Sequence, residues 1–398
     1  MKRVALLCMG LALGAATAAE AQLTMQMSNG WNFTFGGNVN AFLTYESFSD
    51  DGLTLTPGGL VPPSGESETR IRTGLLPAFA VFDAKGKEGE TDLGVHFGFA
   101  PQINCGTGQH DCFGAQIDMR QVYLTFGGSW GQILAGRELG LFGRQNILTD
   151  QTLFGIGATG SGGSPGSGGG GTTLGRIGFG YIYPQFKAQM TYSTAPGRPF
   201  QLSIGLFEAA VNGPYTKTQI PRVEAEGVWT GGQTKVWVGG IAQSTKNPGN
   251  DESASAFGAS GGVRFGSETF SLTGSGYYGK GLGTTLLFNL GSCPAPTCGA
   301  DGSADLRKSY GFIGQVTFTP AGSKVTVAGS YGSSYLKASD TEGGSGKTEN
   351  TLISGGLYYQ ATKSLKVVGE FNYDWTADDT DSEKNTSFAP AVGFMLFF

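Results

Sequence analysis

Eight charged side chains of this sequence could together act on a passing ion or a polar molecule. They are Arg70, Arg72, Asp118, Arg120, Arg137, Glu138, Arg144 and Asp150. Guanidinium and carboxylate groups that face each other across a narrow, wet space attract ions of opposite charge and orient dipolar molecules. These residue types therefore predict electrostatic selection, provided that the elements carrying them bring them together.

Covalent catalysis has little support in the sequence. A catalytic nucleophile needs a neighbouring base such as histidine or a carboxylate to activate it. The chain contains two histidines. His110 lies between two cysteines, and His96 has no serine motif nearby. We therefore expect no enzyme activity, and no cofactor is implied.

Cysteine spacing predicts two local disulfides. After the first 21 residues four cysteines remain, as two close pairs: Cys105 with Cys112, and Cys293 with Cys298. An even number of neighbouring cysteines in an exported chain is typical of disulfides. The alternative is a metal site using His110 and Asp111, but neither pair has the Cys-x-x-Cys spacing.

The amino terminus predicts export. Lys2 and Arg3 precede an apolar run, and the pattern Ala19-Glu20-Ala21 fits a cleavage site before Gln22, so residues 1–21 are read as a signal peptide. The alternative, a membrane anchor, would need roughly 20 apolar residues. Cleavage leaves 24 basic and 30 acidic side chains, a net charge of about −6. This acidic balance argues against a nucleic-acid partner.

Most of the remaining chain alternates apolar and polar residues. The clearest case is Trp31 to Tyr45, where all but Phe42 of the polar-face positions are polar or glycine. Glycine is abundant at 69 residues, and charged residues make up only 14%. A period of two over about 15 residues is longer than an ordinary globular strand. The pattern continues without a linker, which favours one domain over residues 22–398.

The choice of β architecture depends on where the apolar faces go. A soluble sandwich buries them in a core and usually has shorter strands. Aromatic residues near the strand ends, including Trp31, Tyr45, Tyr359 and Trp375, are typical of a membrane barrel, which leaves no unpaired edge in the hydrocarbon. We therefore predict an all-β transmembrane antiparallel barrel. Its sixteen predicted strands are 31–46, 70–83, 90–104, 115–127, 131–140, 175–194, 200–211, 221–230, 234–244, 256–266, 269–280, 309–319, 324–337, 350–361, 364–376 and 387–398.

The connections alternate between long and short, as expected for exterior loops and periplasmic turns. The longest, loop 141–174, carries Arg144, Asp150 and Phe154 in its first half and is almost entirely glycine and serine in its second half. Loops of this length are usually functional or disordered. We expect its first half to fold inward. Pro184 could mark a turn, but the alternation of long and short connections favours one bent strand over 175–194.

Four features resemble the Gram-negative general porins of the sixteen-stranded trimeric family. They are the strand opening Trp31–Val39, the block Met119–Glu138, the long loop after the fifth strand, and the terminal Phe398. The glycine- and serine-rich half of the loop is longer than that family usually shows. The resemblance implies a homotrimer in outer-membrane lipid that passes ions and small hydrophilic solutes by passive diffusion. It also implies a third loop that narrows the barrel, with acidic groups facing wall arginines.

Charge inside a membrane is costly unless it faces water or a partner. Arg70, Arg72, Arg120 and Arg137 are therefore expected to face the lumen, although Val122 and Leu124 share the parity of Arg120. The expected acidic partners are Asp150, Glu138 and Asp118. Arg144 and Asp150 either line the opening or only pin the loop by hydrogen bonds.

Several alternatives stay open at the sequence level. The overall acidity suggests weak cation preference, and the tip around Asp379 could bind a divalent cation or be a solvated loop. A substrate-specific outer-membrane channel is the main rival function, and a barrel enzyme is a remote one. A TonB-type transporter would need a plug domain, for which Gln22–Gly30 is too short. A secreted adhesin would be soluble without detergent.

Overall fold

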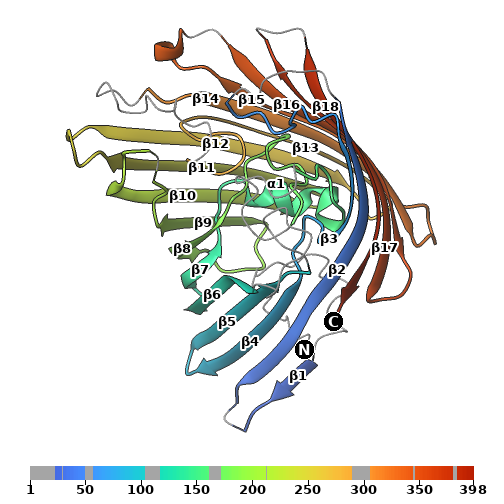
Figure 1. Cartoon of the computed structure of the whole chain (residues 1–398). Coiled ribbons are helices and arrows are strands. Elements are labelled where there is room, and N and C mark those ends of the chain that lie inside the picture. Colours follow the sequence, from blue (N-terminus) through green and yellow to red (C-terminus); the bar gives the residue numbers. More distant parts are fainter. Residues whose placement is uncertain are drawn as a thin grey trace.

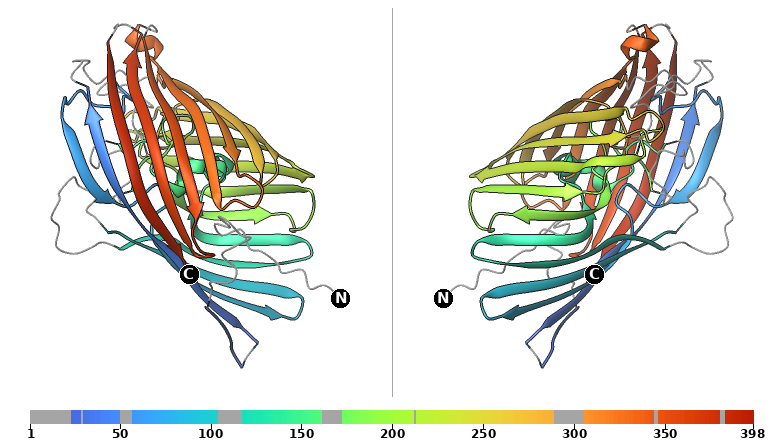
Figure 2. Two further views of the ribbon diagram at one scale, coloured as in Figure 1. Left: turned by 90° about the vertical axis from the view of Figure 1, so that its right-hand side faces the viewer. Right: turned by 90° about the vertical axis from the view of Figure 1, so that its left-hand side faces the viewer.

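The strands form one closed antiparallel wall around a loop that carries a short helix (Figures 1 and 2). The computed structural model describes residues 23–28, 30–49, 57–103, 117–160, 172–211, 213–288, 305–343, 346–379 and 383–398. The predicted signal peptide and all four cysteines of the mature chain lie outside these residues. Within the described residues, no helix has the length and apolar character needed to cross a membrane.

The sheet contains eighteen named strands. They are β1 (Leu23–Gln26), β2 (Asn32–Phe48), β3 (Ser67–Arg72), β4 (Phe79–Glu88), β5 (Thr91–Pro101), β6 (Ile117–Gly128), β7 (Gly131–Leu139), β8 (Phe186–Ser193), β9 (Phe200–Phe207), β10 (Lys217–Gly231), β11 (Thr234–Lys246), β12 (Ser253–Gly266), β13 (Phe270–Lys280), β14 (Lys308–Phe318), β15 (Val325–Lys337), β16 (Lys347–Gln360), β17 (Leu365–Asp378) and β18 (Lys384–Phe397). The helical elements are α1 (Arg144–Thr149), η2 (Gln151–Phe154) and η3 (Asp340–Glu342).

These strands fill sixteen positions of a closed barrel, as the sequence predicts. β3 and β4 share one position, because both pair with β2. β1 pairs with the first residues of β2 and follows the end of β18, where the Gly37 N–H donates to the Phe398 carbonyl oxygen at 2.8 Å. Pairing of β18 with β2 closes the ring, with Val392 opposite Leu43.

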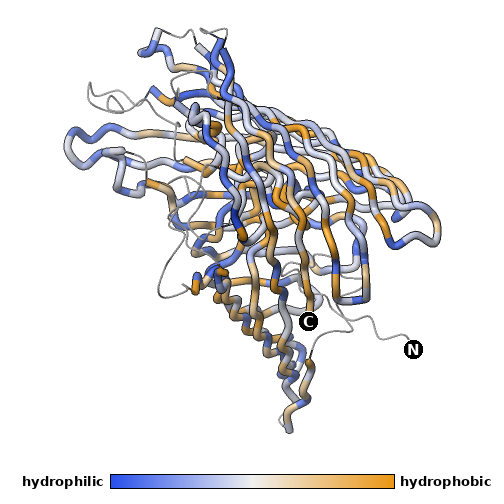
Figure 3. Tube along the Cα trace, turned by 45° about the vertical axis from the view of Figure 1, so that its right-hand side comes forward, coloured by the Kyte–Doolittle hydropathy of each residue, from blue (hydrophilic) through white to orange (hydrophobic). Residues whose placement is uncertain are grey.

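The two faces of the wall differ as the alternation predicts. On β17, Phe371 and Tyr373 are exposed on the outside, whereas Asn372 and Asp374 are buried on the inside. The hydropathy colouring alternates along the strands in the same way (Figure 3). An apolar outside and a polar inside suit lipid around the barrel and water within it. Phe42, the exception on β2, is fully buried and packs with the loop residues Leu153 and Ile156.

The predicted strand 70–83 is interrupted, a break that the alternation of apolar and polar residues does not predict. Residues 73–78 leave the wall between β3 and β4, and amide side chains of β2 bind their backbone instead. Asn40 accepts from the Gly74 N–H at 2.9 Å and donates to the Leu76 carbonyl oxygen at 2.8 Å. Pro77 has no N–H to give to a strand ladder. The interruption turns Leu75 and Phe79 into the interior, although alternation places them outside.

The predicted strand 175–194 is wrong in its first half. β8 begins only at Phe186, and the described residues 172–185 continue the loop inside the barrel. Gly175 and Gly178 have φ of 59° and 80°, and Gln185 has φ of 64°, which are not strand conformations. Pro184 stands next to this last turn. The long connection between β7 and β8 is therefore 140–185, and the alternation of loop lengths is kept.

Candidate functional site

The 140–185 connection, called the inner loop below, crosses the interior and binds the wall on both sides. At its start, Glu224 of β10 accepts from the backbone N–H groups of Leu141 and Phe142 at 2.6 and 2.8 Å. Arg222, two residues earlier on the same face, pairs with Glu224. Both wall side chains are fully buried. A buried carboxylate is stable here because N–H donors and a guanidinium surround it.

On the far side a second wall carboxylate makes the same kind of contact. Glu370 of β17 accepts from the N–H groups of Ile156 and Gly157 at 2.6 and 2.8 Å, and from the Tyr358 hydroxyl at 2.6 Å. At Gly155 the approach is so close that an added Cβ would lie 2.2 Å from the Glu370 Oε1 atom. Two carboxylates that lie far apart in the sequence therefore clamp the first arm of the inner loop.

Charged residues within the inner loop act in the same way. Arg144 forms an ion pair with Glu226 of β10, and the Asn146 side chain accepts from the Trp237 indole N–H of β11 at 2.8 Å. In the returning arm, Arg176 is fully buried and donates to the Leu352 carbonyl oxygen at 3.0 Å and to the Ser330 hydroxyl. These polar contacts fix the loop to β10 and β11 at its start and to β15, β16 and β17 further along.

Asp150 joins the two arms of the loop. Its side chain is 3% exposed and caps η2 by accepting from the Thr152 N–H at 2.9 Å. It also accepts from the Tyr181 hydroxyl of the returning arm at 2.7 Å. Of the two interpretations open at the sequence level, these contacts match the pinning of the loop. The same holds for Arg144, which is half-buried against the buried Glu226.

Two pairs of oppositely charged residues lie on the inner wall, and the partners of each pair are two positions apart in the sequence. Arg70 of β3 is 3.2 Å from Glu68, and the Arg120 Nε of β6 is 2.8 Å from the Asp118 Oδ2. The carboxylate side chains are 34% and 36% exposed, whereas the arginines are 9% and 10% exposed. Solvent in the interior therefore meets mainly the negative ends of these pairs. Arg72 is more deeply buried and donates to the Thr172 carbonyl oxygen at 3.1 Å.

A bulge in β6 explains the conflicting parity of Arg120. Gly98 and Phe99 of β5 pair with Gln121 and Met119, so Arg120 is an extra residue. Arg120 and Gln121 both point inward, and alternation resumes with Leu124 exposed outside. Glu138 is also buried and accepts from the Gln121 side chain at 2.8 Å.

Arg137 lies on the outer face, in contrast to its expected place in the lumen. It is exposed, and its neighbours across the ladder, Val122 and Ala188, belong to the outward-facing rows of β6 and β8. Gly136 and Glu138 occupy the inward positions on either side. The sequence does not indicate which face of β7 carries Arg137, because apolar and polar residues do not alternate clearly at the end of that strand.

Sequence reasoning missed the wall anchors Glu224, Glu226 and Glu370, and the loop residue Arg176. The three glutamates occupy inward positions of clearly alternating segments, which was the available signal. Arg176 falls within the predicted strand 175–194, whose first half belongs to the loop in the structure. These anchors hold the loop in place, because each of them binds groups of the protein itself.

Two further expectations from the sequence concern a cation at the Asp379 tip and catalysis by a histidine. Asp379 is described, and its side chain accepts from the Lys347 N–H at 2.6 Å. No group of three or more potential metal-ligating residues occurs among the residues that the structure describes.

His96 binds Asp83 at 2.9 Å through Nδ1 and stacks on Tyr123, and its buried Nε2 has no hydrogen-bond partner. The described interior therefore shows no nucleophile activated by this histidine.

Comparison with known proteins identifies the class of channel. A family model described as Gram-negative porin matches residues 5–380. The chain belongs to the Gram-negative porin family. This porin is thus a channel protein of the Gram-negative outer membrane and not an enzyme. No curated protein matches the sequence.

Solved structures share the fold of this porin at low identity. The outer membrane channel DcaP of Acinetobacter baumannii has a TM-score of 0.69 at 13% identity, covering 94% of this chain and 99% of that one. The anion-selective porin from Comamonas acidovorans has a TM-score of 0.62 at 12% identity, covering 92% and 100%. The in-vitro folded trimer form of OmpT from Vibrio cholerae has 0.54 at 13%, covering 93% and 100%.

Proposed function

We propose that this porin is a general diffusion channel with weak cation preference, narrowed by the inner loop. The observation that carries the proposal is the pair of inner-wall contacts Glu68–Arg70 and Asp118–Arg120, in which the carboxylate is the exposed partner. A cation in the passage meets these carboxylates first. Asp150, the acidic group first expected to face the opening, is buried and contributes less.

Planar-bilayer recordings test this proposal. We expect conductance to rise linearly with salt and the reversal potential in a salt gradient to show cation preference. Removing one charge about 10 Å from the ion path in water raises the energy of a cation and lowers that of an anion by about 0.4 kcal/mol each, so Glu68→Gln or Asp118→Asn should each lower the cation-to-anion permeability ratio about fourfold. Glu268→Gln, an exposed residue between β12 and β13, is the matched control.

Three outcomes would contradict the proposal. Conductance that saturates with salt would favour the substrate-specific alternative. A selectivity that shifts equally in Glu268→Gln would mean that surface charge, and not the inner-wall pairs, sets the preference. The absence of any conductance step would contradict the channel itself.

Assembly and processing belong to the same proposal. We infer cleavage before Gln22, disulfides Cys105–Cys112 and Cys293–Cys298, and a homotrimer. Support for the trimer comes from the wall itself: β7, β8 and β9 have 9, 8 and 8 residues, against 15, 13 and 14 in β10, β11 and β12. A low wall carrying the outward Arg137 suits a partner subunit better than lipid, where arginine near the midplane costs roughly 2–4 kcal/mol.

A further inference from the structure

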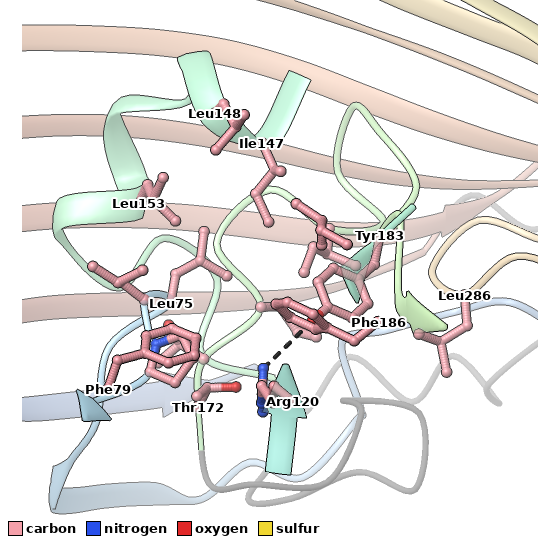
Figure 4. A pocket seen from close by; sticks show the side chains of 16 residues that line it. Leu75, Phe79, Arg120, Ile147, Leu148, Leu153, Thr172, Tyr183, Phe186 and Leu286 are labelled. Carbon is pink, nitrogen blue, oxygen red and sulfur yellow. Dashed lines mark hydrogen bonds between the residues drawn. The ribbon is translucent and has the colours of Figure 1, made fainter. Parts of the chain in front are cut away.

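An apolar recess opens between the inner loop and the wall (Figure 4). We define it by Phe79 at the start of β4, Ile147 of α1, Tyr183 and Phe186 at the loop's return, Leu286 after β13, and Arg120. Nearly all of its other lining side chains are aliphatic. The interior of a diffusion barrel is ordinarily polar. A concave apolar surface with one convergent charged group is instead typical of sites for small organic molecules.

The charged group of the recess is the Arg120 guanidinium. Its Nε is 2.8 Å from Asp118, and its Nη1 is 3.4 Å from the Tyr183 hydroxyl, which is long for a hydrogen bond. The guanidinium also lies 5.9 Å from the centre of the Phe186 ring. A carboxylate at this position would exchange the long contact with Tyr183 for a shorter, charge-assisted one. Arg120 therefore holds the polar end of the recess.

The charge around the recess fits an anion with an apolar body. Arg72 adds a second positive charge behind it, since its Nη2 donates to the carbonyl oxygen of Thr172, a lining residue. The Asp118 carboxylate repels an anion and competes with it for the Arg120 guanidinium. The aromatic rings of Phe79, Tyr183 and Phe186 favour a flat, ring-sized body over an extended chain.

We propose that the recess binds small aromatic carboxylates, with the carboxylate on Arg120 and the ring against the apolar lining. The inference rests on the proposed channel function, because the ligand reaches the recess through the pore. A solute held there obstructs the passage while it is bound. The channel thus retains one class of organic anion transiently although its inner wall favours cations.

Benzoate provides the test, with benzamide as its neutral counterpart and acetate as the anion without a ring. In bilayers at constant ionic strength, we expect benzoate to reduce conductance with half-saturation at about 1–10 mM, as suits a small ligand. Acetate and benzamide should have little effect over that range. Arg120→Gln should weaken the benzoate effect about tenfold, because a hydrogen bond to a charged group is lost.

Three further variants separate the recess from general effects. Asp118→Asn should strengthen the benzoate effect, since the competing carboxylate is removed. Leu286→Asn should weaken it while leaving the charge unchanged. Arg198→Gln, at an exposed position between β8 and β9, should leave it as in the wild type. Near-ultraviolet circular dichroism establishes that each variant is folded.

The inference and the proposed function fail in different ways. Normal conductance with no benzoate effect, or an effect equal in wild type and Arg120→Gln, would overturn the inference alone. Equal inhibition by benzoate and benzamide would also overturn it, because the anion would then not be recognised. Loss of all conductance steps in wild type would overturn the proposed channel function instead.

Discussion

Buried charges in the interior of this porin bind backbone groups more often than they bind one another. Glu370 shows the pattern most clearly, with two backbone N–H groups and a tyrosine hydroxyl around one carboxylate. Such a site tolerates burial because each oxygen has a donor. It also leaves little room, so the residue beside it is restricted to glycine by contact and not by its φ angle.

The restriction at Gly155 makes a direct prediction. Gly155→Ala places a Cβ 2.2 Å from the Glu370 Oε1 atom, so either the loop or the glutamate must move. We expect a loss of about 1–3 kcal/mol in the stability of this contact, which is the usual cost of leaving a buried acceptor unsatisfied. Single-channel current noise should rise. Gly314→Ala on β14, where nothing lies within 4 Å of the added atom, should leave the noise unchanged.

A second residue-scale prediction concerns Glu342 of η3, in the connection between β15 and β16. The hydrogen bonds from Arg307 lower the pKa of its carboxyl from 4.5 to about 2, and those from Ser339 act in the same direction. Because the folded pKa is depressed, the stabilisation is complete above pH 4.5 and is lost as pH falls towards 2. The thermal midpoint of wild type should exceed that of Glu342→Gln at pH 7 and match it near pH 2. A constant difference over this range would contradict the linkage.

At the level of elements, the period of two located most strands, because one face meets polar surroundings and the other does not. This prediction failed where side chains from other segments bind the backbone in place of a neighbouring strand. Asn40 holds residues 73–78 off the wall, and the bulge at Arg120 shifts β6 by one residue. Glycines with positive φ carry 175–185 into the interior. Each failure depends on a contact with another segment or on a local backbone conformation, neither of which the alternation reports.

The same limit applies to the candidate site. Arg70 and Arg72 could be placed inside from charge and strand parity together, whereas Arg120 could be placed there only from its charge, because its parity conflicted. The roles of Asp150 and Arg144 could not be assigned in this way, since a loop residue has no such reference. Their partners, Tyr181 and Glu226, lie 31 and 82 residues away.

The two wall clamps predict independent behaviour of the two ends of the loop's first arm. Glu224→Gln should accelerate hydrogen exchange at the Leu141 and Phe142 amides and leave Ile156 and Gly157 protected. Glu370→Gln should do the reverse. Loss of a charge-assisted acceptor corresponds to about 1.5–3 kcal/mol, or roughly 10- to 150-fold in exchange. Equal acceleration at both ends in either variant would show that the loop opens as one unit.

At the level of the whole molecule, the unequal height of the wall is the main asymmetry. If the low side at β7–β9 faces a partner subunit, residues there are close to another copy and those on the tall side are not. Met190 on β8 and Val238 on β11 are both outward and exposed, at 68% and 61%. Met190→Cys should give intermolecular cross-links with a bifunctional thiol reagent in membranes, and Val238→Cys should not. Equal cross-linking of both would contradict a preferred contact face.

The clamp at Glu370 also has a consequence for biogenesis. The carboxylate follows the loop amides it binds by 213 and 214 residues, and the pairing of β18 with β2 that closes the ring comes later still. Contacts of such long sequence separation form only after a large loss of chain entropy. We therefore expect the inner loop to remain undocked until the last strands have inserted. In an incompletely assembled barrel the loop then does not narrow the passage.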